Sequence, residues 1–294
     1  MLLDTWPPRL IEDLARRRTI IVIGSGVSKH AIAADGVTRP PVWKEFLQSA
    51  IERYDRNERT EHIYNAINSG DLLHACEWIK DLYDEDWSSY LRSQFITPRF
   101  SPGKLHELIA LIDTRVVFSL NFDDIFETKS REINDTSQFV KHYYDTDIVE
   151  FLRGESRYIV KVHGSLSSTA NLIFTQKEYA QARSKHNLFY AAFDAALMSH
   201  SFLFIGCGHN DPDINILLEN QCFSTVQGSN NPHYFLTGEG INSDLKKSLR
   251  NNRNLKTITY DPRDEHHSGL VDFVSELYDK VGEKREELIE TRNW

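Results

Sequence analysis

Four apolar runs with the composition of β-strands each stop abruptly in a short cluster of polar residues or glycine. The runs span residues 19–23, 116–120, 158–162 and 201–205, and β-branched and aromatic side chains dominate them. The clusters that follow are Gly-Ser-Gly-Val-Ser, Asn-Phe-Asp-Asp, His-Gly-Ser and Gly-Cys-Gly-His-Asn-Asp. In an open parallel sheet, ligands bind beyond the carboxyl ends of the strands. We therefore expect the four clusters to converge on one pocket of the kind that holds a dinucleotide.

The segments between these runs are mostly helical in pattern. From about residue 45 to 112 the apolar spacing is helical, although a simple doubly wound fold needs only one helix there, so this stretch is predicted to be a helical insertion. Beyond it helices and strands alternate, and residues 172–174 fit either a short strand or a buried turn. Further strands are expected near 138–143, 232–236 and 255–260. Helices are expected near 8–15, 123–131, 145–153, 176–184, 187–199 and 267–290. Two more helices are expected, one from Asp211 onward and one between the last two strands. This order predicts an α/β, Rossmann-like, doubly wound and mostly parallel sheet in one domain over residues 1–294.

Composition narrows the classes of partner. The net charge of −9 over 294 residues argues against a general surface for nucleic acid or anionic membranes. Three cysteines without CxxC spacing (Cys76, Cys207, Cys222) fit a reducing compartment and exclude a cysteine-only zinc ribbon. There is neither a basic, apolar leader at the start nor a run long enough to cross a membrane. We expect a cytoplasmic protein that does not itself bind membranes or nucleic acid.

The first two clusters each allow a structural and a functional interpretation. Gly24, Ser25, Gly26 and Ser28 suit a turn that binds phosphate, but a full GxGxxG motif is absent and a plain strand–helix turn fits equally well. In the second cluster an Asn or Asp side chain could cap the following helix or face a ligand. The cap is favoured for Asp124 and the ligand site for Asn121.

The third and fourth clusters supply a candidate base and more bare backbone. A single histidine after a strand is usually structural, but the position of His163 beside the other clusters favours a general base, because imidazole titrates near neutral pH. Gly206 and Gly208 allow a ligand to approach the backbone closely. Cys207 between them has no neighbouring acid–base partner in the sequence, so a nucleophilic role is disfavoured.

Taken in order, these motifs resemble those of the sirtuin superfamily over roughly residues 18–262. The Pro-Pro-Val-Trp step at 40–43 and the Asp-Pro-Asp-Ile ending at 211–214 resemble its prokaryotic NADase branch, found in antiviral defence systems such as Thoeris and beside HerA-type ATPases or Argonautes. The resemblance implies that Asn121 and Asp123 contact the nicotinamide end and position water, and that His163 acts on the nicotinamide ribose. It also implies a pyrophosphate loop and an adenosine-ribose turn, formed by Gly24, Ser25, Gly26 and Ser28 and by Gly206, Cys207 and Gly208, respectively.

Two departures from the deacylating sirtuins change the implied reaction. Leu120 stands where those enzymes carry glutamine, and the helical insertion replaces their zinc-binding small domain. The resemblance therefore implies no zinc and NAD as a substrate, cleaved to nicotinamide and ADP-ribose or a cyclised product. It further implies anti-phage defence by NAD depletion, gated by a partner or by assembly, with a homo-oligomer and a HerA-type hexameric ATPase partner. The alternatives are a scaffold or sensor subunit that binds NAD or ADP-ribose and, less favoured, a protein deacylase or ADP-ribosyltransferase.

Overall fold

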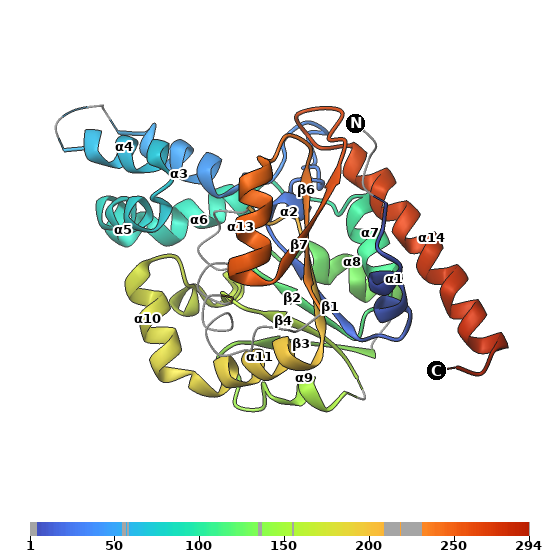
Figure 1. Ribbon diagram of the computed structural model, residues 1–294. Coiled ribbons are helices and arrows are strands. Elements are labelled where there is room, and N and C mark those ends of the chain that lie inside the picture. The colour runs from blue at the N-terminus through green and yellow to red at the C-terminus, as the bar shows by residue number, and fades with distance from the viewer. Residues whose placement is uncertain are drawn as a thin grey trace.

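The core of the protein is a seven-stranded sheet in which every pair of neighbouring strands is parallel (Figure 1). The computed structural model describes residues 5–54, 57, 59–134, 137–154, 156–208, 218 and 231–293. The strands lie in the order β3-β4-β2-β1-β5-β6-β7. Their bounds are β1 Thr19–Ile23, β2 Val116–Ser119, β3 Gln138–His142, β4 Arg157–Lys161, β5 Ser201–Ile205, β6 His233–Gly238 and β7 Leu255–Tyr260. The predicted α/β, Rossmann-like sheet is confirmed.

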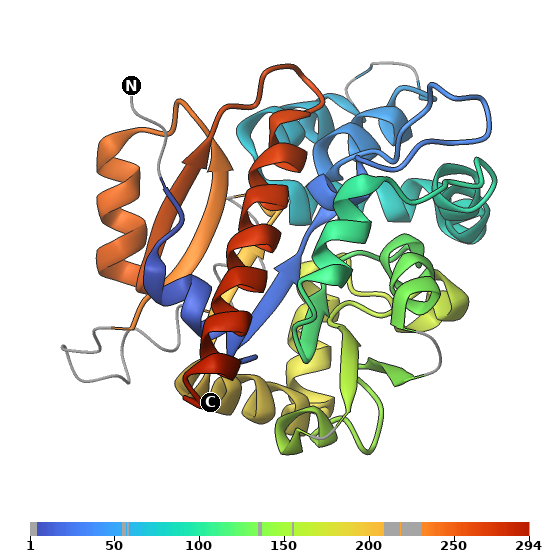
Figure 2. The same ribbon diagram turned by 90° about the vertical axis from the view of Figure 1, so that its right-hand side faces the viewer.

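Helices cover both faces of this sheet because alternate side chains of the apolar strands are buried on opposite sides. In β1, for example, Ile21 and Ile23 belong to one hydrophobic core, whereas Ile20 and Val22 belong to the other. The first core is closed by α1 (Pro8–Ala15), α7 (Lys104–Leu111), α8 (Ile125–Asn134) and α14 (Gly269–Glu290), the last of which crosses the front of Figure 2. The second is closed by α9 (Glu150–Arg153), α10 (Gln176–Lys185), α11 (Asn187–Ser199) and α13 (Ser243–Arg253).

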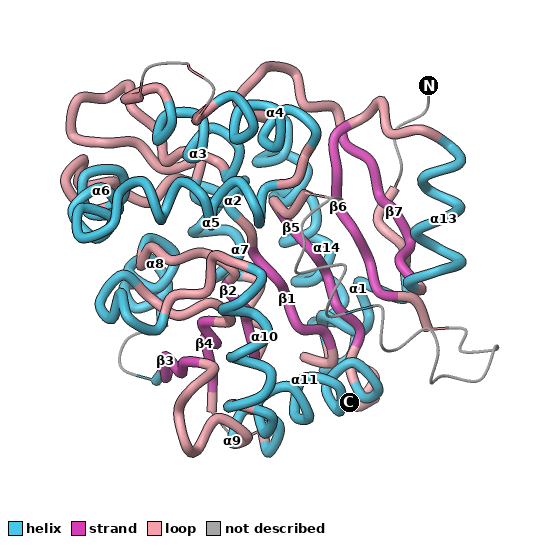
Figure 3. The backbone as a smooth tube through the Cα atoms, turned by 90° about the vertical axis from the view of Figure 1, so that its left-hand side faces the viewer, coloured by secondary structure: helices cyan, strands magenta, loops and turns pink. Residues whose placement is uncertain are grey.

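A separate group of helices, the helical layer, extends from one end of the sheet (Figures 1 and 3). It consists of α3 (Trp43–Ile51), α4 (Glu61–Ser69), α5 (Leu72–Tyr83), the 3₁₀ turn η1 (Asp84–Asp86) and α6 (Trp87–Phe95). These helices pack around an aromatic core of their own, which also takes in Phe122 and Phe174. The predicted insertion thus divides in two, because its last helix, α7, packs between α8 and α14 on the sheet instead.

A few elements differ from the sequence-based expectation. Residues 172–174 form a buried segment after the 3₁₀ helix η3 (Leu166–Asn171), in which Ile173 N donates to His163 O (3.2 Å). The helix near 145–153 is reduced to α9, since turns occupy most of 143–149. The helix expected from Asp211, and Cys222, lie outside the described residues. Within the described ranges, no helix is both long and apolar enough to cross a bilayer.

Candidate functional site

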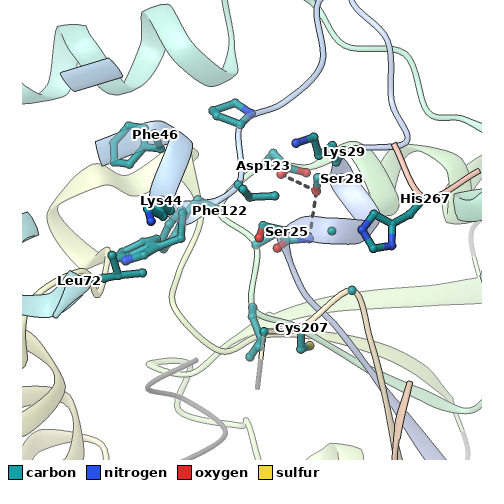
Figure 4. Close-up of a pocket in the computed structure, with 18 of the residues that line it drawn as sticks. Ser25, Ser28, Lys29, Lys44, Phe46, Leu72, Phe122, Asp123, Cys207 and His267 are labelled. Atoms are coloured by element: carbon teal, nitrogen blue, oxygen red, sulfur yellow. Dashed lines mark hydrogen bonds between the residues drawn. The ribbon is translucent and has the colours of Figure 1, made fainter. Parts of the chain in front are cut away.

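One cavity of about 480 Å³ lies where the carboxyl ends of β1, β2, β4 and β5 meet the helical layer (Figure 4). Nine of the ten predicted site residues line it, namely Ser25, Gly26, Ser28, Asn121, Asp123, His163, Gly206, Cys207 and Gly208. The tenth, Gly24, packs against Gly206. The structure therefore brings the four clusters together at one edge of the sheet.

The floor of the cavity is glycine backbone, at the point where β1 lies between β2 and β5. Gly24 N donates to Ile205 O (3.0 Å) and Gly26 N donates to Gly206 O (2.9 Å), so the two strand ends are joined directly. A Cβ atom on Gly24 would lie 2.6 Å from Gly206 O, and one on Gly26 would lie 2.8 Å from Gly206 Cα. These glycines are required by the close approach of two backbones, and the same approach leaves bare backbone facing the cavity.

Asn121 and Ser28 connect the end of β2 to the one-turn helix α2 (Ser25–Ser28), which follows β1 where the sequence predicted a turn. Asn121 Nδ2 donates to Gly24 O (3.0 Å) and to Ser28 Oγ (2.9 Å), and Ser28 Oγ donates to Asp123 Oδ2 (2.8 Å). Both amide hydrogens of Asn121 are thus used within the protein, so Oδ1 is the side-chain atom with which it can hold a water molecule or a substrate N–H group.

Asp123 is buried beside this connection, and burial raises the pKa of its carboxyl group, against the opposing effects of Lys161 and Ser28. Its Oδ1 accepts a hydrogen bond from Ile125 N (3.1 Å), the first amide of α8. The cap interaction that the sequence favoured for Asp124 is therefore made by Asp123. Asp124 accepts a hydrogen bond from Ser165 Oγ instead (3.1 Å).

A buried lysine that the sequence analysis did not single out contacts the segment that follows β2. Lys161, at the end of β4, donates to the backbone carbonyl of Asp123 and lies 2.8 Å from Glu127 Oε1 and 3.6 Å from Asp124 Oδ1. Burial alone would lower the pKa of Lys161, but the nearby carboxylates outweigh that effect and raise it. The signal in the sequence was a single cation inside the otherwise apolar run at 158–162.

His163 is buried between a backbone carbonyl and a phenol. Its Nδ1 lies 3.1 Å from Leu120 O and its Nε2 lies 3.2 Å from Tyr179 Oη. Because a carbonyl oxygen only accepts hydrogen bonds, Nδ1 carries the proton, and Nε2 is the acceptor in the neutral imidazole. This tautomer presents the basic nitrogen on the cavity side, where Tyr179 also contributes to the lining.

The two ends of the cavity differ in chemistry, and the sequence analysis assigned neither a role. One end is formed by the helical layer and is lined mainly by apolar side chains, among them Trp43, Phe46 and Leu72, with Lys44 beside them. At the other end His267 comes from the loop after β7, and the hydroxyl of Tyr260 lies 2.7 Å from its Nδ1. Figure 4 shows Phe46 and Leu72 on one side of Ser25 and Ser28, and His267 on the other. Partial desolvation lowers the pKa of His267.

Within the described residues, no group of three or more His, Cys, Asp or Glu side chains is placed to hold a metal ion. In a comparison with known families, residues 115–258 match the sequence profile of the SIR2-like domain family. This region carries most of the site residues described above. This part of the chain is therefore similar to SIR2-like domains. It supplies Asn121, His163 and Gly206, whereas the turn after β1 and the helical layer lie before the matched region.

Several curated proteins named NAD(+) hydrolase ThsA are distant relatives of the chain. The protein from Acinetobacter baumannii (strain 532279) is 26% identical over 213 residues, which cover 71% of this chain and 40% of that protein. Those from Enterococcus faecium and Cytobacillus dafuensis are 22% and 20% identical over 231 and 255 residues, covering 77% and 85% of this chain and 44% and 47% of theirs. The chain thus spans less than half the length of these relatives. The similarity supports the predicted resemblance to sirtuin-like NADases, while the association with HerA or Argonaute stays a prediction.

Proposed function

We propose that this chain binds NAD in the cavity and hydrolyses the glycosidic bond between nicotinamide and ribose. The observation that carries the proposal is the placement of Asn121 and His163 at neighbouring strand ends, above a floor of bare glycine backbone. A pyrophosphate can approach the backbone at the β1–β5 junction. The similarity of this chain to proteins named NAD(+) hydrolase points to the same substrate.

Each part of the cavity then contacts a different part of the dinucleotide. Ser25, Gly26 and Ser28 lie at the pyrophosphate, and the turn at 206–208 lies at the adenosine ribose. The nicotinamide ribose lies between Asn121 and His163, so the nicotinamide ring is next to the apolar end of the cavity. Asp123 contributes through Ser28, because its carboxylate accepts a hydrogen bond from the Ser28 hydroxyl.

Cleavage of the glycosidic bond builds positive charge on the ribose as nicotinamide leaves. Asn121 Oδ1 accepts a hydrogen bond from the attacking water, and the proton from water or from a ribose hydroxyl is transferred toward His163 Nε2. A positioned general base accelerates such a step by roughly 10²–10⁴-fold. The products are nicotinamide and ADP-ribose.

We further propose that the reaction serves anti-phage defence by depleting NAD and is gated, since unrestrained NAD loss is toxic to the cell that makes the enzyme. The gate would lie in a partner, for which a HerA-type hexameric ATPase is our candidate, or in a homo-oligomer of this chain acting in the cytoplasm. The support for this biological role is the similarity to the ThsA proteins.

The decisive experiment is mass spectrometry of NAD incubated with the purified chain, alone and with the product of a neighbouring gene. We expect nicotinamide and ADP-ribose from the wild type, and a rate at least ~100-fold lower from His163→Ala and from Asn121→Ala. His74→Ala is the matched control, because His74 is an exposed histidine of α5 that pairs with Asp71. Thermal melting of each variant separates loss of chemistry from loss of fold.

The same assay distinguishes the alternatives. Near-wild-type NAD consumption by both site variants contradicts the assignment. Tight NAD binding without nicotinamide release, even with the partner present, indicates a scaffold or sensor subunit. Nicotinamide release that requires an acylated peptide indicates a deacylase.

A further inference from the structure

The nitrogen that must accept a proton in the proposed reaction already has a hydrogen-bond donor. His163 Nδ1 donates to Leu120 O, so the neutral ring has a single acceptor lone pair, on Nε2. The hydroxyl of Tyr179 lies 3.2 Å from that atom and donates to it. A substrate hydroxyl therefore reaches this lone pair either after Tyr179 has moved away or through the Tyr179 hydroxyl itself.

The packing of Tyr179 opposes its moving away. Its ring is buried in the hydrophobic core on the α11 side of the sheet and lies edge-on to the His163 ring, with centroids 5.5 Å apart. Removing a ring of this size from a packed core loses its contacts and leaves a cavity behind. Displacement of the phenol is therefore the less favourable of the two routes.

The first turn of α10 fixes the position of the tyrosine. Thr175 Oγ1 accepts a hydrogen bond from Glu178 N (3.2 Å), and Glu178 Oε2 accepts hydrogen bonds from Thr175 N (3.0 Å) and Phe174 N (2.8 Å), which together make a capping box. The other oxygen of Glu178 pairs with Lys80 of α5. The helix that carries Tyr179 is thus fixed both to its own start and to the helical layer.

We propose that Tyr179 is a catalytic residue that relays the proton from the substrate to His163, an inference that rests on the proposed hydrolysis of NAD. A phenol can donate its own hydrogen while a lone pair on the same oxygen accepts another. The substrate oxygen, in water or a ribose hydroxyl, gives its proton to Tyr179 Oη as the phenol proton passes to His163 Nε2. The phenol ends neutral, the imidazole becomes imidazolium, and the substrate oxygen keeps the electron pair of its broken O–H bond.

The test compares Tyr179→Phe with Tyr90→Phe in the NAD cleavage assay. Tyr90 is the matched control because it is a buried tyrosine of α6 whose hydroxyl donates to Phe46 O (3.1 Å). We expect Y179F to lower kcat by about 10²-fold with little change in KM, since the relay acts on the chemical step. Y90F should keep the wild-type kcat. The double variant Y179F/H163A should be no slower than H163A alone, because the two residues act as one unit.

Three results would overturn the relay. An unchanged kcat in Y179F shows that substrate reaches His163 directly. A raised kcat shows that the hydroxyl blocks the base. A double variant that is slower than H163A by the full factor of Y179F shows that the two residues act separately.

A spectroscopic measurement separates this failure from failure of the proposed function. Histidine side-chain ¹⁵N–¹H spectra of the full chain, with H163A used for assignment, should show His163 as the Nδ1–H tautomer. Its Nε2 signal should shift in Y179F and not in Y90F. A wild type that leaves NAD intact contradicts the proposed function, whereas an Nε2 signal that is the same in wild type and Y179F contradicts the relay alone.

Discussion

Replacing Lys161 by methionine tests the charge network beneath the candidate site. The side chain of Lys161 is 0% exposed and that of its partner Glu127 is 3% exposed, so neither charge is solvated by water. Methionine keeps a similar volume but leaves the carboxylate of Glu127 buried without its cation. Breaking a buried ion pair in this way costs about 3–5 kcal/mol, so we expect the free energy of unfolding of Lys161→Met to fall by that amount.

Two further variants show whether the loss comes from the unpaired charge. Lys129→Met, on the same helix as Glu127, removes an ion pair with Glu132 (2.6 Å) whose carboxylate is 55% exposed. Solvent screens that pair, so the cost should stay below about 1 kcal/mol. Lys161→Met combined with Glu127→Gln removes the unpaired carboxylate and should recover much of the lost stability.

The loss should also depend on pH. Burial raises the pKa of Glu127 above its unfolded value, and without Lys161 that pKa rises further. A carboxyl group with a raised pKa binds its proton more tightly in the folded state, so the proton-linked stability is present at low pH and is lost as the pH rises through the folded pKa. The deficit of Lys161→Met should therefore shrink on acidification, by at most ~1.4 kcal/mol per pH unit.

The assay is urea unfolding followed by tryptophan fluorescence, at neutral and at mildly acidic pH. The reasoning is wrong if Lys161→Met unfolds within about 1 kcal/mol of the wild type at neutral pH, a range typical of exposed pairs. It is equally wrong if the deficit grows as the pH falls.

Two smaller changes test the β1–β5 junction and the connection through Ser28. Gly206 has φ +67° and a Cβ there would lie 2.5 Å from Val27 N, so Gly206→Ala should lose about 2–5 kcal/mol of stability in urea unfolding. Gly240→Ala, at φ +95° with open space around it, should lose only about 1–2 kcal/mol; equal losses would contradict the close-approach argument. Ser28→Ala removes the donor to Asp123 and the acceptor of Asn121, and should cost about 1–3 kcal/mol by thermal melting and lower kcat for NAD. A kcat equal to that of the wild type would show that Ser28 does not contribute to the reaction.

The sheet and the gathering of the four clusters could be predicted because each strand that precedes a cluster is a short apolar run that ends in a clear break. Runs such as 19–23 and 201–205 are buried on both faces, as only central strands of a covered parallel sheet are. Once the strands are parallel, their carboxyl ends meet at one edge, so the cluster at Asn121 and the one at His163 become neighbours whatever their separation in sequence.

The packing partners of helices could not be predicted in this way. The apolar spacing of α7 is that of any amphipathic helix, and it does not reveal that α7 packs on the sheet with α14 rather than with α3–α6. Tyr179 was missed for the same reason. Its role depends on where the capping box starts α10 and on which side then faces His163, and both are properties of the folded chain.

The residues of the site differ in whether a substitution affects catalysis alone or also the stability of the fold. Asn121 and the glycines at 24 and 206 hold β1, β2 and β5 together, so a variant there weakens the fold as well as any activity. A loss of NAD cleavage in Asn121→Ala alone would therefore be ambiguous. Within the described part of the chain, His163 contacts a backbone carbonyl and the hydroxyl of Tyr179, and Y179F removes a single oxygen atom without creating a cavity in the core. Substitutions at this pair should lower kcat far more than they lower the melting temperature. His163 and Tyr179 are therefore the positions at which the proposed chemistry is most directly tested.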